Sequence, residues 1–402
     1  MSILILCIIY AAFISLGLPD GMLGAAWPTI RGQFGLPLGY AGFVSLTISA
    51  GTIVSSLLSV KVLRRFGTGK VSAVSVLLTA VGLLGFSLAP SFGWLFLFAI
   101  PLGIGGGAID SGLNEYVAEH YKASHMNFLH SFWGIGALTG PLVMSAFIRQ
   151  NGVWQNGYRF TAAVQFVLVI VMFCALPVWK RAERKSRLEH EALLARAERE
   201  NITHPAKKTF IESIRVPGVK EVLLCFMTYA SMEFMLGLWG SSYLTAVKGF
   251  ETARAAAWVS LYYGGITAGR FLCGFLAMKL SNKTLIRTGA LTALTGVACL
   301  FAGHYTGVGD WCTLCGFIFF GLGCAPIFPA MLHETPARFG KDNAQAVMGF
   351  QMAVAYTSSA LMPPLFGWVA TIASVSILPW VLAGFALVLF ICSEKANGIF
   401  KK

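Results

Sequence analysis

Apolar residues come in long runs along this chain, and short polar connections separate the runs. A helix of ~20 apolar residues is long enough to cross the ~30 Å hydrocarbon core of a bilayer. The pattern predicts twelve such helices, over residues 3–29, 39–60, 71–90, 94–118, 126–148, 157–179, 221–246, 255–280, 284–303, 311–334, 344–370 and 374–393. Apolar residues make up 56% of the chain and charged residues 12%, against ~25% charged in soluble proteins. The sequence therefore predicts an all-α membrane protein.

One long polar stretch, residues 180–220, divides the predicted helices into two groups of six, over residues 1–179 and 221–402. Its first part, residues 181–200, has mixed charge and is rich in helix-forming residues. Glu183 and Arg187 are one helical turn apart, a spacing that favours a helix. We expect this stretch to be a cytoplasmic linker that is partly helical and lies on the membrane surface.

The two groups of helices resemble each other in sequence. An acid–x–x–x–Gly motif occurs at residues 20–24 and again at residues 233–237, and a tryptophan follows each copy, Trp27 and Trp239. Because each group has an even number of spans, the two repeats have the same orientation in the membrane. We therefore expect two six-helix bundles in parallel repeat, the arrangement of major facilitator transporters.

The basic residues that give the chain its net charge of +13 are unevenly divided between the two sides of the membrane. With the N-terminus in the cytoplasm, 24 of the 30 Lys and Arg residues fall in cytoplasmic connections, the linker and the C-terminal tail, and 5 fall outside. Such a bias is the positive-inside signal. It predicts cytoplasmic termini and gives no reason to expect a nucleic-acid partner. The N-terminal apolar run lacks a basic start, so we interpret it as a retained span.

Four ionisable residues lie inside predicted spans, about 12–15 Å from a span end at 1.5 Å per residue or midway along it: Asp20, Asp110, Glu233 and Arg270. A charge at this depth costs at least ~2.5–3.5 kcal/mol. Burial favours the protonated form of a carboxyl group and a nearby cation favours the ionised form. These residues are therefore candidates for proton coupling, although Arg270 pairing with one acid only to hold two helices together is the alternative.

Other polar and aromatic residues in the spans are candidates for substrate binding. Hydrogen-bonding groups and flat aromatic faces both suit a sugar ring. The candidates are Asn114, His130, Trp133, Trp27, Trp239, Tyr262, Gln351 and Tyr356. For the tryptophans near span ends, membership of the interfacial aromatic belt is the alternative interpretation.

Enzyme chemistry has no support in the sequence. The nine cysteines lie almost entirely within spans, and their spacing indicates neither disulfide bonds nor a metal site. The glycines at residues 103–107 lie within a predicted helix, where close helix packing explains them better than phosphate binding. We expect no enzyme activity, no metal and no cofactor other than a coupling ion.

With these residues in view, the chain resembles the major facilitator superfamily and, within it, the fucose–proton symporter family. The resemblance lies in residues 18–21, 110–114 and 127–133. It implies that Asp20 and Asp110 couple protonation to sugar binding, by alternating access. His130 and Trp133 stand where that family has amides, and residues 61–67 lack the aspartate usual in the superfamily. The first difference bears on the substrate, and the second is a departure from the superfamily's loop signature.

Taken together, the sequence predicts a secondary transporter that carries a monosaccharide or similar small polar solute by proton symport. We expect a monomer in a bilayer, the bacterial cytoplasmic membrane. Three alternatives stay open: a proton-antiporting exporter of drugs or metabolites, a sodium-coupled sugar symporter, and a membrane sensor that transports nothing.

Overall fold

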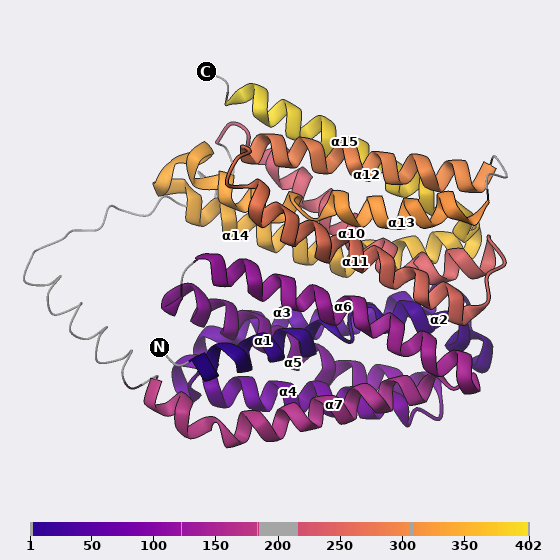
Figure 1. The fold of residues 1–402 in the computed structure, drawn as a ribbon, viewed down its shortest axis with the longest axis horizontal. Coiled ribbons are helices and arrows are strands. Elements are labelled where there is room, and N and C mark those ends of the chain that lie inside the picture. The colour runs from indigo at the N-terminus through magenta and orange to yellow at the C-terminus, as the bar shows by residue number, and fades with distance from the viewer. Residues whose placement is uncertain (1–2, 122, 183, 185–215, 306–308, 401–402) are drawn as a thin grey trace, which may run out of the picture.

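The computed structural model describes residues 3–121, 123–182, 184, 216–305 and 309–400, and its regular elements are helices (Figure 1). The first group of helices is α1 (Ile3–Gly17), α2 (Met22–Phe34), α3 (Tyr40–Phe66), α4 (Thr68–Ser87), α5 (Phe92–His120), α6 (Ala123–Asn151) and α7 (Trp154–Cys174). The second group is α10 (Val219–Ala246), α11 (Thr252–Leu276), α12 (Asn282–Tyr305), α13 (Asp310–Cys324), α14 (Ile327–Ile372), the 3₁₀ turn η1 (Val375–Ile377) and α15 (Leu378–Ile399).

Helices occur at all twelve predicted spans, so the all-α membrane fold is confirmed. In the described part of the chain, ten helices are long and apolar enough to cross a membrane. The two predicted spans that do not meet this criterion are α11 and the part of α14 after residue 340. Arg254 and Arg270 lie in α11, and Gln351 and Tyr356 lie in that part of α14. The least apolar spans thus carry several of the candidate site residues.

The first predicted span is not one continuous helix. It consists of α1 and α2 with a turn over residues 18–21 between them. Pro19 has no backbone N–H and cannot continue a helical ladder. The turn is closed instead by short bonds from the Asp20 N–H to the Gly17 carbonyl (3.2 Å) and from the Met22 N–H to the Pro19 carbonyl (3.1 Å). Asp20 therefore lies in a helix break, where its backbone leaves the regular helix.

Gly340 separates the tenth and eleventh predicted spans within α14. Its φ of 75° is non-helical and divides the element into two helices. This left-handed conformation suits glycine because it has no Cβ. The predicted spans 311–334 and 344–370 therefore correspond to α13 with the first part of α14, and to the remainder of α14.

The helices form two groups side by side, with α1–α7 in one and α10–α15 in the other (Figure 1). Glycines bring helices into close contact within the first group: a Cβ on Gly17 would lie 2.1 Å from the Trp133 carbonyl oxygen, and one on Gly136 would lie 2.1 Å from that of Ile14. This contact between α1 and α6 holds Asp20 near the middle of α6. The predicted boundaries at 179 and 221 stay predictions, and the linker helix lies largely outside the described residues.

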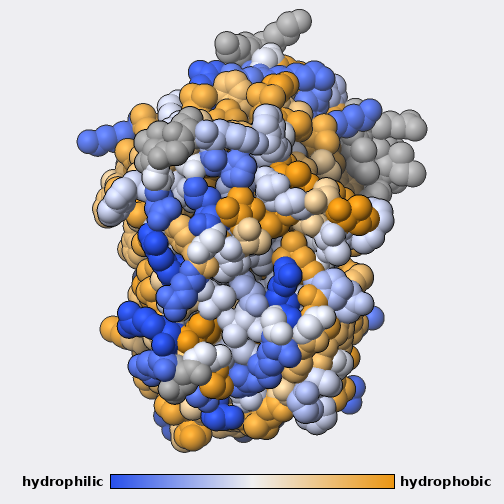
Figure 2. All heavy atoms as spheres, turned by 90° about the vertical axis from the view of Figure 1, so that its right-hand side faces the viewer, coloured by the Kyte–Doolittle hydropathy of each residue, from blue (hydrophilic) through white to orange (hydrophobic). Residues whose placement is uncertain are grey.

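The two groups meet closely at the end of the molecule away from the chain termini. We call this the distal end and define it by the connections at residues 35–39, 152–153 and 247–251. A Cβ on Gly24 would lie 2.2 Å from the Gly237 carbonyl oxygen, and the Gly39 N–H donates to the Thr371 hydroxyl at 2.9 Å. Figure 2 shows this end face-on, with hydrophilic residues over much of its face and hydrophobic residues along its sides.

The Gly24–Gly237 contact predicts a strong effect of any added side chain. Gly24→Val forces α2 away from α10, at a cost of about 1–3 kcal/mol for overpacking, and we expect a lower melting temperature of the purified protein. Gly32→Val is the matched control, because Gly32 is also in α2 and no atom lies within 4 Å of its Cβ position. Equal melting temperatures of the two variants would contradict close contact here.

Candidate substrate and proton site

Asp20 has a side-chain partner on another helix. The indole Nε1–H of Trp133, in α6, donates to the Asp20 Oδ2 at 2.7 Å. The helix break at Pro19 and the close packing of α1 against α6 bring these two groups together. A hydrogen bond to an ionised acceptor is about twice as strong as one between neutral groups. Trp133 therefore stabilises the ionised form of Asp20.

Trp133 also contacts the second group of helices, through the face of its indole ring. The Arg270 guanidinium, on α11, lies over the Trp133 ring at 4.7 Å from its centroid. Its Nη2 also donates to Glu233 Oε1, on α10, at 3.2 Å, and both side chains are largely buried. Arg270 and Glu233 are thus an ion pair, and the sequence had left open whether they meet. Asp20, Trp133, Arg270 and Glu233 form a continuous polar chain between the two groups.

Asp110 makes a second polar contact between the groups. The Asn114 side-chain amide, one turn along α5, donates to the Asp110 Oδ1 at 2.9 Å and to its carbonyl oxygen at the same distance. The Tyr356 hydroxyl, on α14, donates to the Asp110 Oδ2 at 3.3 Å. All three side chains are partly exposed. Groups that hold a carboxylate in this way can also hold the hydroxyl groups of a solute.

Asp20 is exposed to solvent although it lies far from both span ends. One turn further along the chain, Gly24 packs against Gly237 and the distal end is covered. The close contact at Gly24 lies on the distal side of Asp20, so we interpret this conformation as one in which the polar chain is accessible from the side of the chain termini.

Three further ionisable groups surround the polar chain. Tyr263, on α11, interacts electrostatically with Asp20 and Glu233, and Tyr229, on α10, interacts with Glu233 and Arg270. The Tyr229 hydroxyl is buried next to the Glu233–Arg270 pair. His130, on α6, is half-buried beside the Phe13 ring, with the Arg270 charge nearby. His130 thus lies beside the polar chain, and its role in substrate binding stays a prediction.

Four predicted site residues lie outside this cluster. Trp27 and Trp239 are fully buried, and their indole N–H groups donate to the carbonyl oxygens of Leu38 (2.8 Å) and Pro363 (2.9 Å). In this conformation both pack inside the distal end, and their role in substrate binding stays a prediction.

Tyr262 and Gln351 are buried in the same way. Tyr262 is fully buried, and its hydroxyl donates to the backbone carbonyl of Glu233 at 2.9 Å. Gln351 is also fully buried and bonds the Thr335 hydroxyl through its Nε2 at 2.9 Å. In this conformation their polar atoms bond within the protein, and their role in substrate binding stays a prediction.

Tyr229 and Tyr263 were missed by the sequence reasoning, although a signal existed. Tyr229 precedes Glu233 by four residues, and Tyr263 precedes Arg270 by seven, so each pair lies on one helix face. The periodicity thus favours Tyr263 over its neighbour Tyr262 as the residue that shares the face of Arg270. Selecting tyrosines by this spacing finds both.

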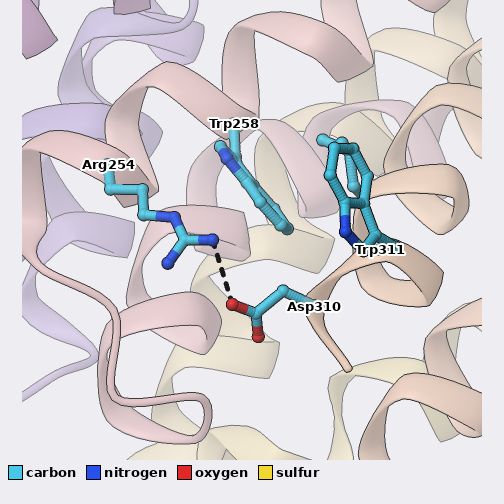
Figure 3. Close-up of a pocket in the computed structure, with 5 residues that line it drawn as sticks. Arg254, Trp258, Asp310 and Trp311 are labelled. Atoms are coloured by element: carbon cyan, nitrogen blue, oxygen red, sulfur yellow. Dashed lines mark hydrogen bonds and ion pairs between the residues drawn. The ribbon is translucent and has the colours of Figure 1, made fainter. Parts of the chain in front are cut away.

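A separate pocket of about 390 Å³ lies at the distal end (Figure 3). It is lined by the first turns of α11 and α13, and the Arg254 Nη2 contacts the Asp310 Oδ2 there at 2.9 Å. The pairing is half-exposed, and such pairs contribute only ~0–1 kcal/mol. The two indoles at this pocket, Trp258 and Trp311, are in positions typical of the membrane–water interface. The pocket is distinct from the cluster of acids.

The major facilitator superfamily profile matches residues 9–357, most of the chain. The protein belongs to this superfamily. It is therefore a secondary transporter with a small-molecule substrate, a multi-pass membrane protein and not an enzyme. The polar chain between the two helix groups accordingly belongs to a transporter, and the acids at its two ends are candidates for the transport mechanism.

Relatives and solved structures extend over nearly the whole chain. A cis,cis-muconate transport protein of Acinetobacter baylyi is 24% identical, covering 88% of this chain and 92% of its own. A glucose/mannose transporter of Bacillus subtilis is 21% identical, covering 89% and 86%. The inward-open xylose transporter of E. coli superposes with a TM-score of 0.74 at 15% identity, covering 98% and 95%. This structural likeness shows the fold.

The buried pair predicts a large effect of removing one partner. Glu233→Gln leaves the Arg270 charge unpaired, which typically costs about 3–5 kcal/mol, so we expect a marked loss of thermal stability. Glu394→Gln is the control, because it removes the partner of Arg287 in a more exposed ion pair, where about 0–1 kcal/mol is expected. The double variant Glu233→Gln/Arg270→Met should recover much of the loss. A harmless Glu233→Gln would argue against the pair.

Proposed function

We propose that this protein takes up a monosaccharide, or a similar small polar solute without net charge, together with protons. The observation that carries the proposal is the pair of polar contacts between the two helix groups, from Asp20 through Trp133 to Arg270 and from Asp110 to Tyr356. Alternating access requires the two groups to move relative to each other. The surroundings of Asp110, whose partner Tyr356 lies across this division, therefore change when the groups move, and so do those of Trp133, which contacts Arg270 across it.

Proton coupling follows from this change of surroundings. An acid favours its ionised form beside a donor or cation, and its protonated form when such partners withdraw. Asp110 has a hydrogen-bond donor in the opposite helix group, Tyr356, and Asp20 bonds Trp133, whose ring contacts Arg270 of the opposite group. The proton therefore binds in one conformation and leaves in the other. Glu233 keeps Arg270 neutralised and is the third acid of the site.

The charge balance of the site favours a neutral substrate. Three acids face one arginine, and that arginine is already covered by Glu233 and the Trp133 ring. An anionic solute such as a dicarboxylate therefore meets repulsion and, among the residues that the structure describes, finds no unpaired cation at this site. A polyhydroxy solute meets hydroxyl-binding groups in Asn114, Tyr356 and the acids, and an indole face in Trp133.

The relatives support the same substrate class without deciding it. The glucose/mannose transporter transports sugars, as its name states, and the muconate transport protein points to a carboxylate. The resemblance of residues 18–21 and 110–114 to the fucose–proton symporter family adds weight to a sugar. A carboxylate substrate is disfavoured, because Arg270 is already paired with Glu233.

The charge of the connections indicates how the protein is oriented in the membrane. We place both termini in the cytoplasm of a bacterial cell, because 24 of 30 basic residues then lie inside. The conformation with a closed distal end then opens to the cytoplasm and corresponds to solute release. Uptake completes its cycle when the distal contacts at Gly24 and Gly39 separate.

A second candidate is export of a cationic compound in exchange for protons. The excess of three acids over one arginine favours a cation as much as protons, and the site contains the aromatic ring of Trp133. The two functions differ in their ligands, in the direction of flux and in the effect of sodium removal, which also tests sodium coupling.

A thermal-shift screen of the purified protein tests the substrate class. The probes are D-glucose, D-mannose, D-xylose, L-fucose, cis,cis-muconate and tetraphenylphosphonium, with and without sodium. A bound ligand raises the melting temperature in proportion to the logarithm of its concentration over its dissociation constant. We expect stabilisation by one or more of the sugars. Stabilisation by the lipophilic cation alone would favour the exporter, and stabilisation by muconate alone would contradict the charge argument.

The coupling role predicts a separation of two transport activities in proteoliposomes. Asp110→Asn keeps the hydrogen-bonding shape but cannot ionise, so we expect solute exchange at near wild-type rates and at least about tenfold lower accumulation driven by a pH gradient. Asp310→Asn, at the distal surface pocket, is the control and should retain both activities. Undiminished accumulation by Asp110→Asn would reject the role of Asp110 in coupling.

A further inference from the structure

Trp133 contacts one ionisable side chain in each of the two helix groups. Its indole N–H points to Asp20 of the first group at 2.7 Å. Its ring face carries the Arg270 guanidinium of the second group at 4.7 Å. A single rigid side chain therefore touches an acid on one side of the division and a cation on the other.

The surrounding packing fixes this position of Trp133. Its own backbone carbonyl is the close neighbour of Gly17, and the next residue, Gly134, packs against Thr267 of α11. A Cβ on Gly134 would lie 2.5 Å from the Thr267 Oγ1, so α6 and α11 approach each other closely at this level. The indole has little freedom to move unless α6 and α11 move too.

We propose that Trp133 is a positioning residue that transmits the charge state of Asp20 to the Arg270–Glu233 pair. When Asp20 is ionised, the charge-assisted bond from the indole N–H holds the ring in place under Arg270. When Asp20 takes up a proton, that bond weakens to the strength of a neutral one. The ring is then held less firmly against α11, and the cation–π contact that supplements the ion pair of Arg270 with Glu233 weakens as α6 and α11 separate.

The chemistry of the indole suits this task. Its N–H can only donate, so it distinguishes an ionised acceptor from a neutral one. Tryptophan also provides the most favourable ring face for a cation. Both ends of the contact belong to one rigid ring system, and a change at the N–H therefore reaches the ring face directly.

Other ionisable residues also surround Asp20 and Arg270. Asp20 also interacts with Asp110 of α5, Glu233 of α10 and Tyr263 of α11. Around Arg270 lie Tyr229 and Cys324 beside Glu233, Tyr262 on its own helix, and His130 of α6. These groups act through space and remain in place when Trp133 is replaced. The direct electrostatic effect of Asp20 on the pair is therefore separable from the effect that passes through the indole.

This inference deepens the proposed proton coupling, yet its test needs no substrate. Asp20→Asn serves as a mimic of protonated Asp20 at constant pH. Cys273, three residues after Arg270 on α11 and partly exposed, serves as the reporter. Its labelling rate with N-ethylmaleimide is measured by peptide mass spectrometry relative to exposed Cys174 of α7. Absence of sugar transport would leave this measurement unaffected.

In the otherwise wild-type protein, Asp20→Asn should change the relative labelling rate of Cys273 about fivefold or more, the lower range of typical allosteric coupling. In the Trp133→Phe background the same change should be less than about twofold, because phenylalanine keeps an aromatic face but has no N–H donor. Trp154→Phe is the matched control: it removes an indole N–H that donates to Gln33 at 2.7 Å, and it should preserve the full response.

Two outcomes overturn the proposal. One is an equal response to Asp20→Asn with and without the Trp133 N–H, which would assign the coupling to direct electrostatics. The other is no response in the wild-type background, which would mean that the charge of Asp20 does not reach α11. Should Trp133→Phe fail to fold, Trp133→Met allows the same comparison.

Discussion

The cost of an ionised side chain inside a bilayer is the constraint on which the rest of this structure depends. Arg270 cannot be kept charged at this depth without a partner, and Glu233 is that partner. The pair neutralises itself, which leaves Asp20 and Asp110 as the acids with ionisation free to change. The arrangement of α6, α10 and α11 around Arg270 then decides which groups can respond to those two acids.

A break in the helix exposes Asp20 in a way that a continuous helix would not. The turn at residues 18–21 exposes Asp20 without leaving unsatisfied backbone groups in contact with lipid, because the break faces the space between the two helix groups. At the distal end, glycines close the structure instead: Gly24 and Gly39 have no side chains, and the two helix groups touch there. The segment from Asp20 through α2 to Gly39 therefore links the exposed acid to the contacts that close the distal end.

The fold was predictable from the sequence, and the site only in part. Hydropathy locates spans because length and apolarity are local properties, and Pro19 next to Asp20 and Gly21 was a signal for the helix break that the prediction did not use. The acids and Arg270 stand out because charges inside apolar runs are rare. The partners of Trp27 and Trp239 were beyond prediction, since they are backbone carbonyls whose positions depend on how whole helices pack. The same holds for the contact between Trp133 and Asp20, which requires the rotation of α6 set by Gly136.

The central claim is that solute and proton cross this membrane together through the site around Asp20 and Asp110. Proteoliposomes in a lightly buffered medium, with a pH electrode outside, measure this directly when the solute identified by the thermal-shift screen is added without any imposed gradient. The account predicts that the external medium becomes more alkaline as solute enters, with a fixed ratio of protons to solute. Solute entry with no change in external pH would contradict it.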